Sequence, residues 1–416
     1  MSYYVKTVCS RCGRPLQGKF YDACPTCQKD GVNANYKTVY DLKDAKLPPK
    51  GNGQPGIFRF REFFALGDND PVVSLGEGNT PFRRLERMGE KLGMPNLYIK
   101  DESKNPTMSH KDRLCSIVAS QALAWKVPGL TIASTGNQGA SIAAYASACG
   151  LPCVVFTTPN VSMAMKCLMQ AYGAYVFVTP TLPDRLIIMD KLVRQYGFMP
   201  ACGVMKPPIG SSCYGFDGYK TIAFELYEQM GGDIPDWIVV PISYGGMLYG
   251  IFKGFCDLKE MGYIKKIPRL AACEVLGPLE KTIEAGSNDP IAQPARPSIL
   301  TSMATGMVAY HAVHAVMDSN GVSRCSGDEE AKQMQKTLAQ TEGIFGEAAT
   351  ATPFVVIEKL LAEGVMKPDE KVVAIITSTG LKDLETVETW LPEIPCINPT
   401  VEELRDGLWK SYNIKL

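Results

Sequence analysis

Residues 105–114 read Asn-Pro-Thr-Met-Ser-His-Lys-Asp-Arg-Leu, and residues 134–141 read Ser-Thr-Gly-Asn-Gln-Gly-Ala-Ser. In the first stretch, Lys111 follows a turn and begins an expected helix. A lysine at a helix N-terminus feels the positive end of the helix dipole, which lowers its pKa and favours the neutral amine. Such an amine can form a Schiff base with a carbonyl. In the second stretch, Asn137 lies in a loop between an expected strand and helix. Together, in this order, the two stretches predict a site for an aldehyde cofactor.

Short apolar segments alternate with helical segments through most of the chain. We expect strands at residues 96–100, 130–133, 152–157, 175–178, 236–242, 270–274 and 371–377. Apolar strands separated by helices are typical of parallel βαβ units whose sheets are covered on both faces. The fold class is therefore α/β with open parallel sheets, in which ligands bind at the carboxyl ends of the strands.

Two further loops follow expected strands at such ends. The amides of Ser243, Tyr244, Gly245, Gly246 and Met247 are placed to cradle a phosphate at a helix start. This loop is neither a GxGxxG fingerprint nor a Walker A loop, which argues against NAD and ATP. The hydroxyl of Thr377 follows the last apolar strand and is placed to bond a heteroaromatic nitrogen. The alternative for the segment after Thr377 is a helix N-cap.

These stretches resemble the fold-type II pyridoxal-phosphate enzymes, and among them the threonine synthases. The resemblance covers roughly residues 73–385 and includes Glu77-Gly-Asn-Thr-Pro81 and the segment that begins at Thr377. It implies a tryptophan synthase β-like fold of two domains with open parallel sheets. It also implies pyridoxal 5'-phosphate on Lys111, with Asn137 at the phenolic oxygen, residues 243–247 at the phosphate and Thr377 at the pyridine nitrogen.

The resemblance further implies an amino-acid substrate that contacts residues of the same loops. The residues expected to contact it are Thr80, Ser109, His110, Ser134, Thr135, Gln138, His311 and His314. The two last histidines stand three apart on an expected helix and so share one face. They are candidates for acid–base groups or an anion site; the alternative is helix-surface or partly buried histidines.

Several positions depart from the threonine synthase pattern. His110 replaces a phenylalanine, the phosphate loop lacks its usual asparagines, and Gly215 stands where an arginine binds the substrate phosphate. Losing a guanidinium removes a bidentate phosphate clamp. The default function is conversion of O-phosphohomoserine and water to threonine and phosphate, an amino-acid biosynthesis reaction. The alternative is a diverged β-replacement or β-elimination lyase acting on a serine- or threonine-type substrate, O-phosphorylated or not. A third reading is a non-catalytic zinc-ribbon interaction protein.

The N-terminal segment carries two CxxC pairs. Cys9, Cys12, Cys24 and Cys27 have the spacing of a zinc ribbon, whose four thiolates would fill a structural site. So small a unit has too little core to fold alone, and a metal would stabilise it. The alternative is four reduced cysteines, or a degenerate ribbon without metal.

We expect a zinc ribbon at residues 1–36, a large pyridoxal-phosphate-binding domain at 55–115 and 205–416, and a small α/β domain at 116–204. The formal net charge is zero, which argues against a general nucleic-acid or membrane-surface binder. No apolar run approaches the roughly 20 residues of a membrane helix, and the N-terminus lacks a signal-peptide core. We therefore expect a cytoplasmic protein, and the resemblance implies a homodimer.

Overall fold

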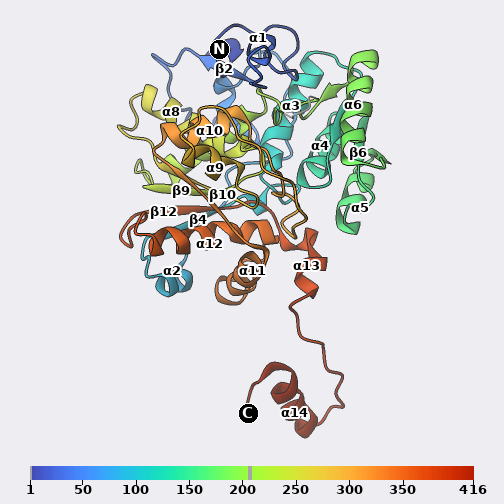
Figure 1. Ribbon diagram of the computed structural model, residues 1–416, viewed down its shortest axis with the longest axis vertical. Coiled ribbons are helices and arrows are strands. Elements are labelled where there is room, and N and C mark those ends of the chain that lie inside the picture. The colour runs from blue at the N-terminus through green and yellow to red at the C-terminus, as the bar shows by residue number, and fades with distance from the viewer. Residues whose placement is uncertain (1, 205–208) are drawn as a thin grey trace.

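The computed structural model describes residues 2–204 and 209–416 of the chain. The fold is built on two separate larger sheets, one of six strands and one of four. Figure 1 shows these sheets with the helices that cover them. The larger sheet has the order β11-β10-β9-β12-β4-β3. Its strands are β3 (Phe82–Arg84), β4 (Leu97–Asp101), β9 (Trp237–Pro241), β10 (Arg269–Glu274), β11 (Val322–Cys325) and β12 (Val372–Ile376). All neighbours pair in parallel except β3 with β4.

The larger sheet is covered on both faces, and its strands are correspondingly apolar throughout. All five residues of β12 are buried. Val373 and Ile375 belong to one core, whereas Val372, Ala374 and Ile376 belong to another, because successive side chains of a strand point to opposite faces. Figure 1 shows α12 (Ala348–Ala362), α11 (Asp328–Glu342) and α2 (Glu86–Leu92) over one face. On the other side Figure 1 shows α8 (Gly246–Glu260), α9 (Pro278–Glu284) and α10 (Tyr310–Asp318). Helix α7 (Phe216–Gln229) packs against α8.

The smaller sheet has the order β7-β6-β5-β8, and all its strands run parallel. They are β5 (Leu130–Ala133), β6 (Cys153–Thr157), β7 (Tyr175–Val178) and β8 (Met199–Pro200). Its helices are α4 (Asn137–Ala148), α5 (Met163–Ala171) and α6 (Leu182–Tyr196). Helix α3 (Lys111–Ala124) packs against both α4 and α7 and so lies between the two sheets.

The N-terminal unit is a two-stranded antiparallel sheet of β1 (Tyr4–Cys9) and β2 (Tyr36–Tyr40), with the short helix α1 (Pro25–Gln28). It is attached to the large sheet's helices by buried polar contacts. The hydroxyls of Thr38 and Tyr40 donate to the Asp217 carboxylate of α7 at 2.8 and 2.6 Å. Lys253 of α8 pairs with the same carboxylate. The unit is therefore fixed to the body of the molecule.

The remaining elements of the described residues are three short 3-10 helices and two helices near the C-terminus. The 3-10 helices are η1 (Gly56–Phe63), η2 (Glu102–Lys104) and η3 (Gly380–Lys382), and η3 precedes α13 (Leu384–Glu388). Helix α14 (Val401–Tyr412) buries none of its residues and lies apart from the body in Figure 1. In the part of the chain that the structure describes, no helix is both long and apolar enough to cross a membrane.

The α/β class and the seven expected strands are confirmed. Five strands of the described chain were not expected. Two are β1 and β2 of the N-terminal unit. The others, β3, β8 and β11, are only two to four residues long, or carry polar residues such as Ser323 and Arg324. The domain ranges stay a prediction, and the expected return to the large domain at 205 lies outside the described residues.

Candidate active site

Lys111 is the first residue of α3, directly after the turn that contains Met108 with a positive φ of 58°. Burial lowers the pKa of its amine, and the nearby Cys115 and Glu347 act against that shift. Asp112 does not neutralise the lysine, because its carboxylate faces inward. It accepts hydrogen bonds from the Thr107 amide at 2.6 Å and the Ser141 hydroxyl at 2.6 Å. Lys111 therefore has the character of an amine tuned towards its neutral form.

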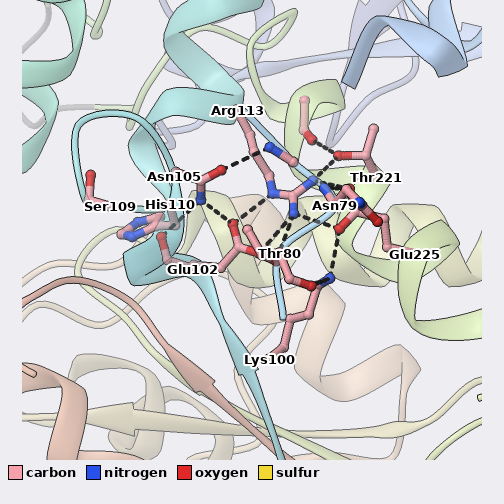
Figure 2. Close-up of polar contacts among 12 residues, drawn as sticks. Asn79, Thr80, Lys100, Glu102, Asn105, Ser109, His110, Arg113, Thr221 and Glu225 are labelled. Atoms are coloured by element: carbon pink, nitrogen blue, oxygen red, sulfur yellow. Dashed lines mark hydrogen bonds and ion pairs between the residues drawn. The ribbon is translucent and has the colours of Figure 1, made fainter. Parts of the chain in front are cut away.

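A buried ion network holds the helix that carries Lys111. Figure 2 shows the Arg113 guanidinium between the carboxylates of Glu102 and Glu225, with its Nε 2.7 Å from Glu102 and its Nη1 2.7 Å from Glu225. Lys100 donates to the second carboxylate at 2.7 Å. None of these four side chains is more than 2% exposed. Although burial alone would raise the pKa of Glu225, Arg113 and Lys100 hold it well below its usual range. The network ties the start of α3 to β4 and α7.

Asn137 begins α4 at the carboxyl end of β5. Its amide nitrogen donates to both oxygens of the Glu347 carboxylate at 3.2 and 3.1 Å. Its amide oxygen accepts from the Ser378 hydroxyl at 3.1 Å and from the Lys382 ammonium at 2.9 Å. The loop itself is closed by Ser134, whose hydroxyl oxygen accepts from the amides of residues 136 and 139.

The turn before Lys111 is paired with the end of β12. The amide of His110 donates to the Thr377 carbonyl at 3.0 Å, and its Nδ1 lies 3.2 Å from the same oxygen. Ser109 and Ser378 form an isolated antiparallel bridge. The Thr377 hydroxyl lies 3.1 Å from that of Thr350. The structure thus brings the Lys111, Asn137 and Thr377 segments into mutual contact.

The expected phosphate loop leads from β9 into α8, with Gly245 in the left-handed region at φ 87°. A Cβ at Gly245 would lie 2.2 Å from the Cβ of Ala312, so only glycine fits against α10. The first amides of a helix have no intrahelical acceptor, and they favour an anion. Residues 243–247 therefore have the form of an anion-binding turn.

Two buried ionisable groups of the site had no role assigned from the sequence. Burial raises the pKa of the Glu347 carboxyl to about 7, although Lys382 and Asn137 act against the shift. Burial lowers the pKa of Lys382, with Glu347 and Asp112 opposing. Lys382 stands in the segment after Thr377 that shows the family resemblance. Only the folded chain places Glu347 and Lys382 on either side of Asn137.

The residues expected to contact substrate have different surroundings. The hydroxyl of Thr80 donates to Glu102 within the Arg113 network, and the Ser109 hydroxyl accepts the Lys111 amide at 3.3 Å. The Gln138 side chain donates a hydrogen bond to the Ala201 carbonyl and accepts one from the Ser211 hydroxyl. Thr135 is partly exposed in the loop beside Asn137. Their roles towards a substrate stay predictions.

The two histidines of α10 do not share one environment. His311 is buried between the rings of Phe216 and Tyr249, and both its ring nitrogens lack a partner among the described residues. Desolvation lowers its pKa to about 3. His314 instead lies against Tyr310, with its Nε2 3.3 Å from the Asn288 carbonyl. Neither forms a hydrogen bond to the residues around Asn137 in the described part of the chain.

The four N-terminal cysteines form a compact cluster that could hold a metal ion, with all four sulfurs within 4.8 Å of one another. The Cys9 and Cys27 sulfurs lie 3.6 Å apart, and the Cys12 and Cys24 sulfurs 3.8 Å apart. Sulfurs held at about 2.3 Å around a tetrahedral ion lie about 3.8 Å apart.

The chain matches the family model "Pyridoxal-phosphate dependent enzyme" over residues 73–378. A protein named threonine synthase from Methanocaldococcus jannaschii is 32% identical, over 90% of this chain and 92% of the relative. Another with that name from Methanosarcina acetivorans is 30% identical, over 98% of this chain and 99% of the relative.

Solved structures agree on the fold. Maize serine racemase superposes with a TM-score of 0.63 at 21% identity, covering 74% of this chain and 90% of that one. Diaminopropionate ammonia lyase from Escherichia coli superposes with a TM-score of 0.66 at 17% identity, covering 76% and 89%.

Proposed function

We propose that this chain, which belongs to the pyridoxal-phosphate-dependent enzyme family, acts as a threonine synthase and converts O-phosphohomoserine and water to threonine and phosphate. The similarity to two proteins named threonine synthase, which extends over at least 90% of this chain, carries the proposal. Lys111, Asn137 and Thr377 are all present and their segments meet, which argues against a non-catalytic interaction protein.

The residues present fit pyridoxal phosphate. The cofactor needs an amine for covalent attachment, and Lys111 supplies one whose pKa burial lowers. It needs an anion site for its phosphate, which the turn at Gly245 and the start of α8 supply. The Asn137 amide would face its phenolic oxygen and the Thr377 hydroxyl its ring nitrogen. When bound, the cofactor withdraws electrons from the carbon that bears the substrate's amino group.

The protein's own task is to move protons. We infer that the Lys111 Nζ would take the proton from the substrate's Cα as general base. Its lowered pKa supports this role because a base must be neutral at working pH. Glu347, whose pKa of about 7 suits proton exchange near neutrality, lies close enough to Lys111 to influence its titration.

One observation favours the runner-up, a β-replacement or β-elimination enzyme on a serine- or threonine-type substrate. By the family resemblance, Gly215 takes the place of the arginine that binds the substrate phosphate in threonine synthases. A Cβ there would lie 2.7 Å from Cγ of Leu114 and 3.2 Å from Cγ2 of Val118. The position therefore packs against α3, and a larger side chain fits only if the side chains of Leu114 and Val118 shift.

Two further features belong to the same proposal. We infer that the cluster of Cys9, Cys12, Cys24 and Cys27 holds structural zinc, which the sulfur spacing supports. The homodimer and the cytoplasmic location stay predictions from the resemblance and the composition.

The test is phosphate release from O-phosphohomoserine by the purified cofactor-loaded protein, with the amino-acid product identified and Lys111→Ala as the inactive control. Release of phosphate with formation of threonine supports the proposal. If phosphate is not released, but serine- or threonine-type amino acids still change the cofactor spectrum, the β-replacement or β-elimination alternative is supported instead.

A further inference from the structure

Lys382 joins three segments that come from distant parts of the chain. Its ammonium donates to the Thr107 carbonyl, in the turn before Lys111, and to the Asn137 amide oxygen at 2.9 Å. Lys382 itself belongs to η3, five residues after Thr377. Only 4% of the residue is exposed. One buried cation therefore contacts the turn that precedes the expected attachment lysine, the asparagine loop and its own segment, which continues from Thr377.

The contacts of Asn137 determine which way its amide points. An ammonium carries three donors and no acceptor, so the Asn137 atom that faces Lys382 has to be the oxygen. The Ser378 hydroxyl reinforces this arrangement by donating to the same oxygen. The amide nitrogen must then face the opposite direction, where the Glu347 carboxylate accepts from it.

We propose that Lys382 is a positioning residue that fixes the Asn137 amide with its N–H groups directed towards the anionic oxygen of the bound cofactor. The inference rests on the proposed cofactor, but not on the identity of the substrate. Glu347 accepts from this amide in the structure, so the same N–H groups already face oxygen acceptors.

A cation is better suited to this position than a neutral group. Without Lys382, the Asn137 amide oxygen would accept only from the Ser378 hydroxyl, which can also donate to the Met108 carbonyl 3.1 Å away. The amide could then rotate and present its oxygen to the cofactor's anionic oxygen, replacing attraction with repulsion. Hydrogen bonds that involve a charged partner contribute about 1.5–3 kcal/mol, or roughly a tenfold to hundredfold change in affinity.

The experiment is a double-mutant cycle on cofactor binding, with Lys382→Met and Asn137→Ala singly and together. The dissociation constant of pyridoxal 5'-phosphate is measured by absorbance on the apoprotein, without any substrate. We expect K382M to weaken binding roughly tenfold to hundredfold in the wild-type background but less than about twofold in the Asn137→Ala background. Lys382→Gln, whose amide retains a hydrogen-bond donor, should lose less cofactor affinity than K382M.

Equal losses of cofactor affinity in both backgrounds would show that Lys382 acts independently of Asn137. No loss of affinity in either background would show that Lys382 has no positioning role. A larger loss in K382Q than in K382M would also contradict the proposal, and K382Q serves in the cycle if K382M fails to fold. Thermal unfolding of each apoprotein separates misfolding from lost binding. An enzyme that passes this cycle yet releases no phosphate from O-phosphohomoserine would overturn only the proposed reaction.

Discussion

Replacing Arg113 with methionine should destabilise the protein strongly, because two buried carboxylates depend on its guanidinium. Arg113 makes hydrogen bonds of 2.7–2.8 Å to both oxygens of Glu102 and both oxygens of Glu225. With Lys100, the network contains two positive and two negative groups. The substitution leaves a net charge of −1 in a site that is at most 2% exposed.

Breaking a buried ion pair by removing one partner costs about 3–5 kcal/mol. We expect the free energy of unfolding of R113M at pH 7 to be lower than that of the wild type by this amount. The difference should shrink as the pH falls, because a carboxylate left without its guanidinium takes up a proton. Glu102 should contribute most of the loss, since Glu225 retains Lys100. The double variant R113M/Glu102→Gln restores neutrality and should recover part of the stability.

The assay is urea denaturation of the apoprotein between pH 5.5 and 8. Arg324→Met is the matched control, because the Arg324–Glu363 pair is exposed, with side chains 28% and 39% accessible. Such a pair contributes at most about 1 kcal/mol. If R113M and Arg324→Met were equally stable at pH 7, or if the loss in R113M grew as pH fell, the charge argument would be refuted.

Three other substitutions test the site and the cysteine cluster. Lys111→Ala should abolish the borohydride-reducible absorbance of the bound cofactor, whereas Lys104→Ala, at a side chain 62% exposed, should retain it; a retained band in the first variant would exclude Lys111 as the attachment point. Cys24→Ser should lower the zinc content measured by mass spectrometry, and the exposed Cys167 serves as the serine-variant control; equal zinc content in both would exclude the metal site. The Glu347 carboxyl has a pKa raised to about 7, so the folded state holds its proton longer and stability should fall as pH rises from about 4.5 to about 7. Glu347→Gln should remove up to about 3 kcal/mol of this fall, and an unchanged pH profile of unfolding would contradict it.

The local pattern of residues was sufficient to predict the fold class and most strands. Apolar runs such as residues 371–377 are long enough, and apolar enough on both sides, to specify a fully covered parallel strand. The candidate cofactor site was likewise predictable from local sequence, because a lysine after a turn and an asparagine in a βα loop are recognised within a few residues. The four cysteines formed a cluster because two CxxC turns need only one antiparallel pair of strands to meet.

The partners of these residues depend on the tertiary structure. Lys382 and Glu347 lie 245 and 210 positions from Asn137 in sequence, yet both contact its amide. No spacing rule relates residues so far apart, because their contact depends on how β12, α12 and the β5–α4 loop pack. The same holds for Arg113, which is charged and lies in a helix, but is buried by Glu102 and Glu225 from two other elements. The periodicity of apolar residues predicts strands and helices. The pKa and the role of an ionisable residue depend on its burial and on the charges that the fold places beside it.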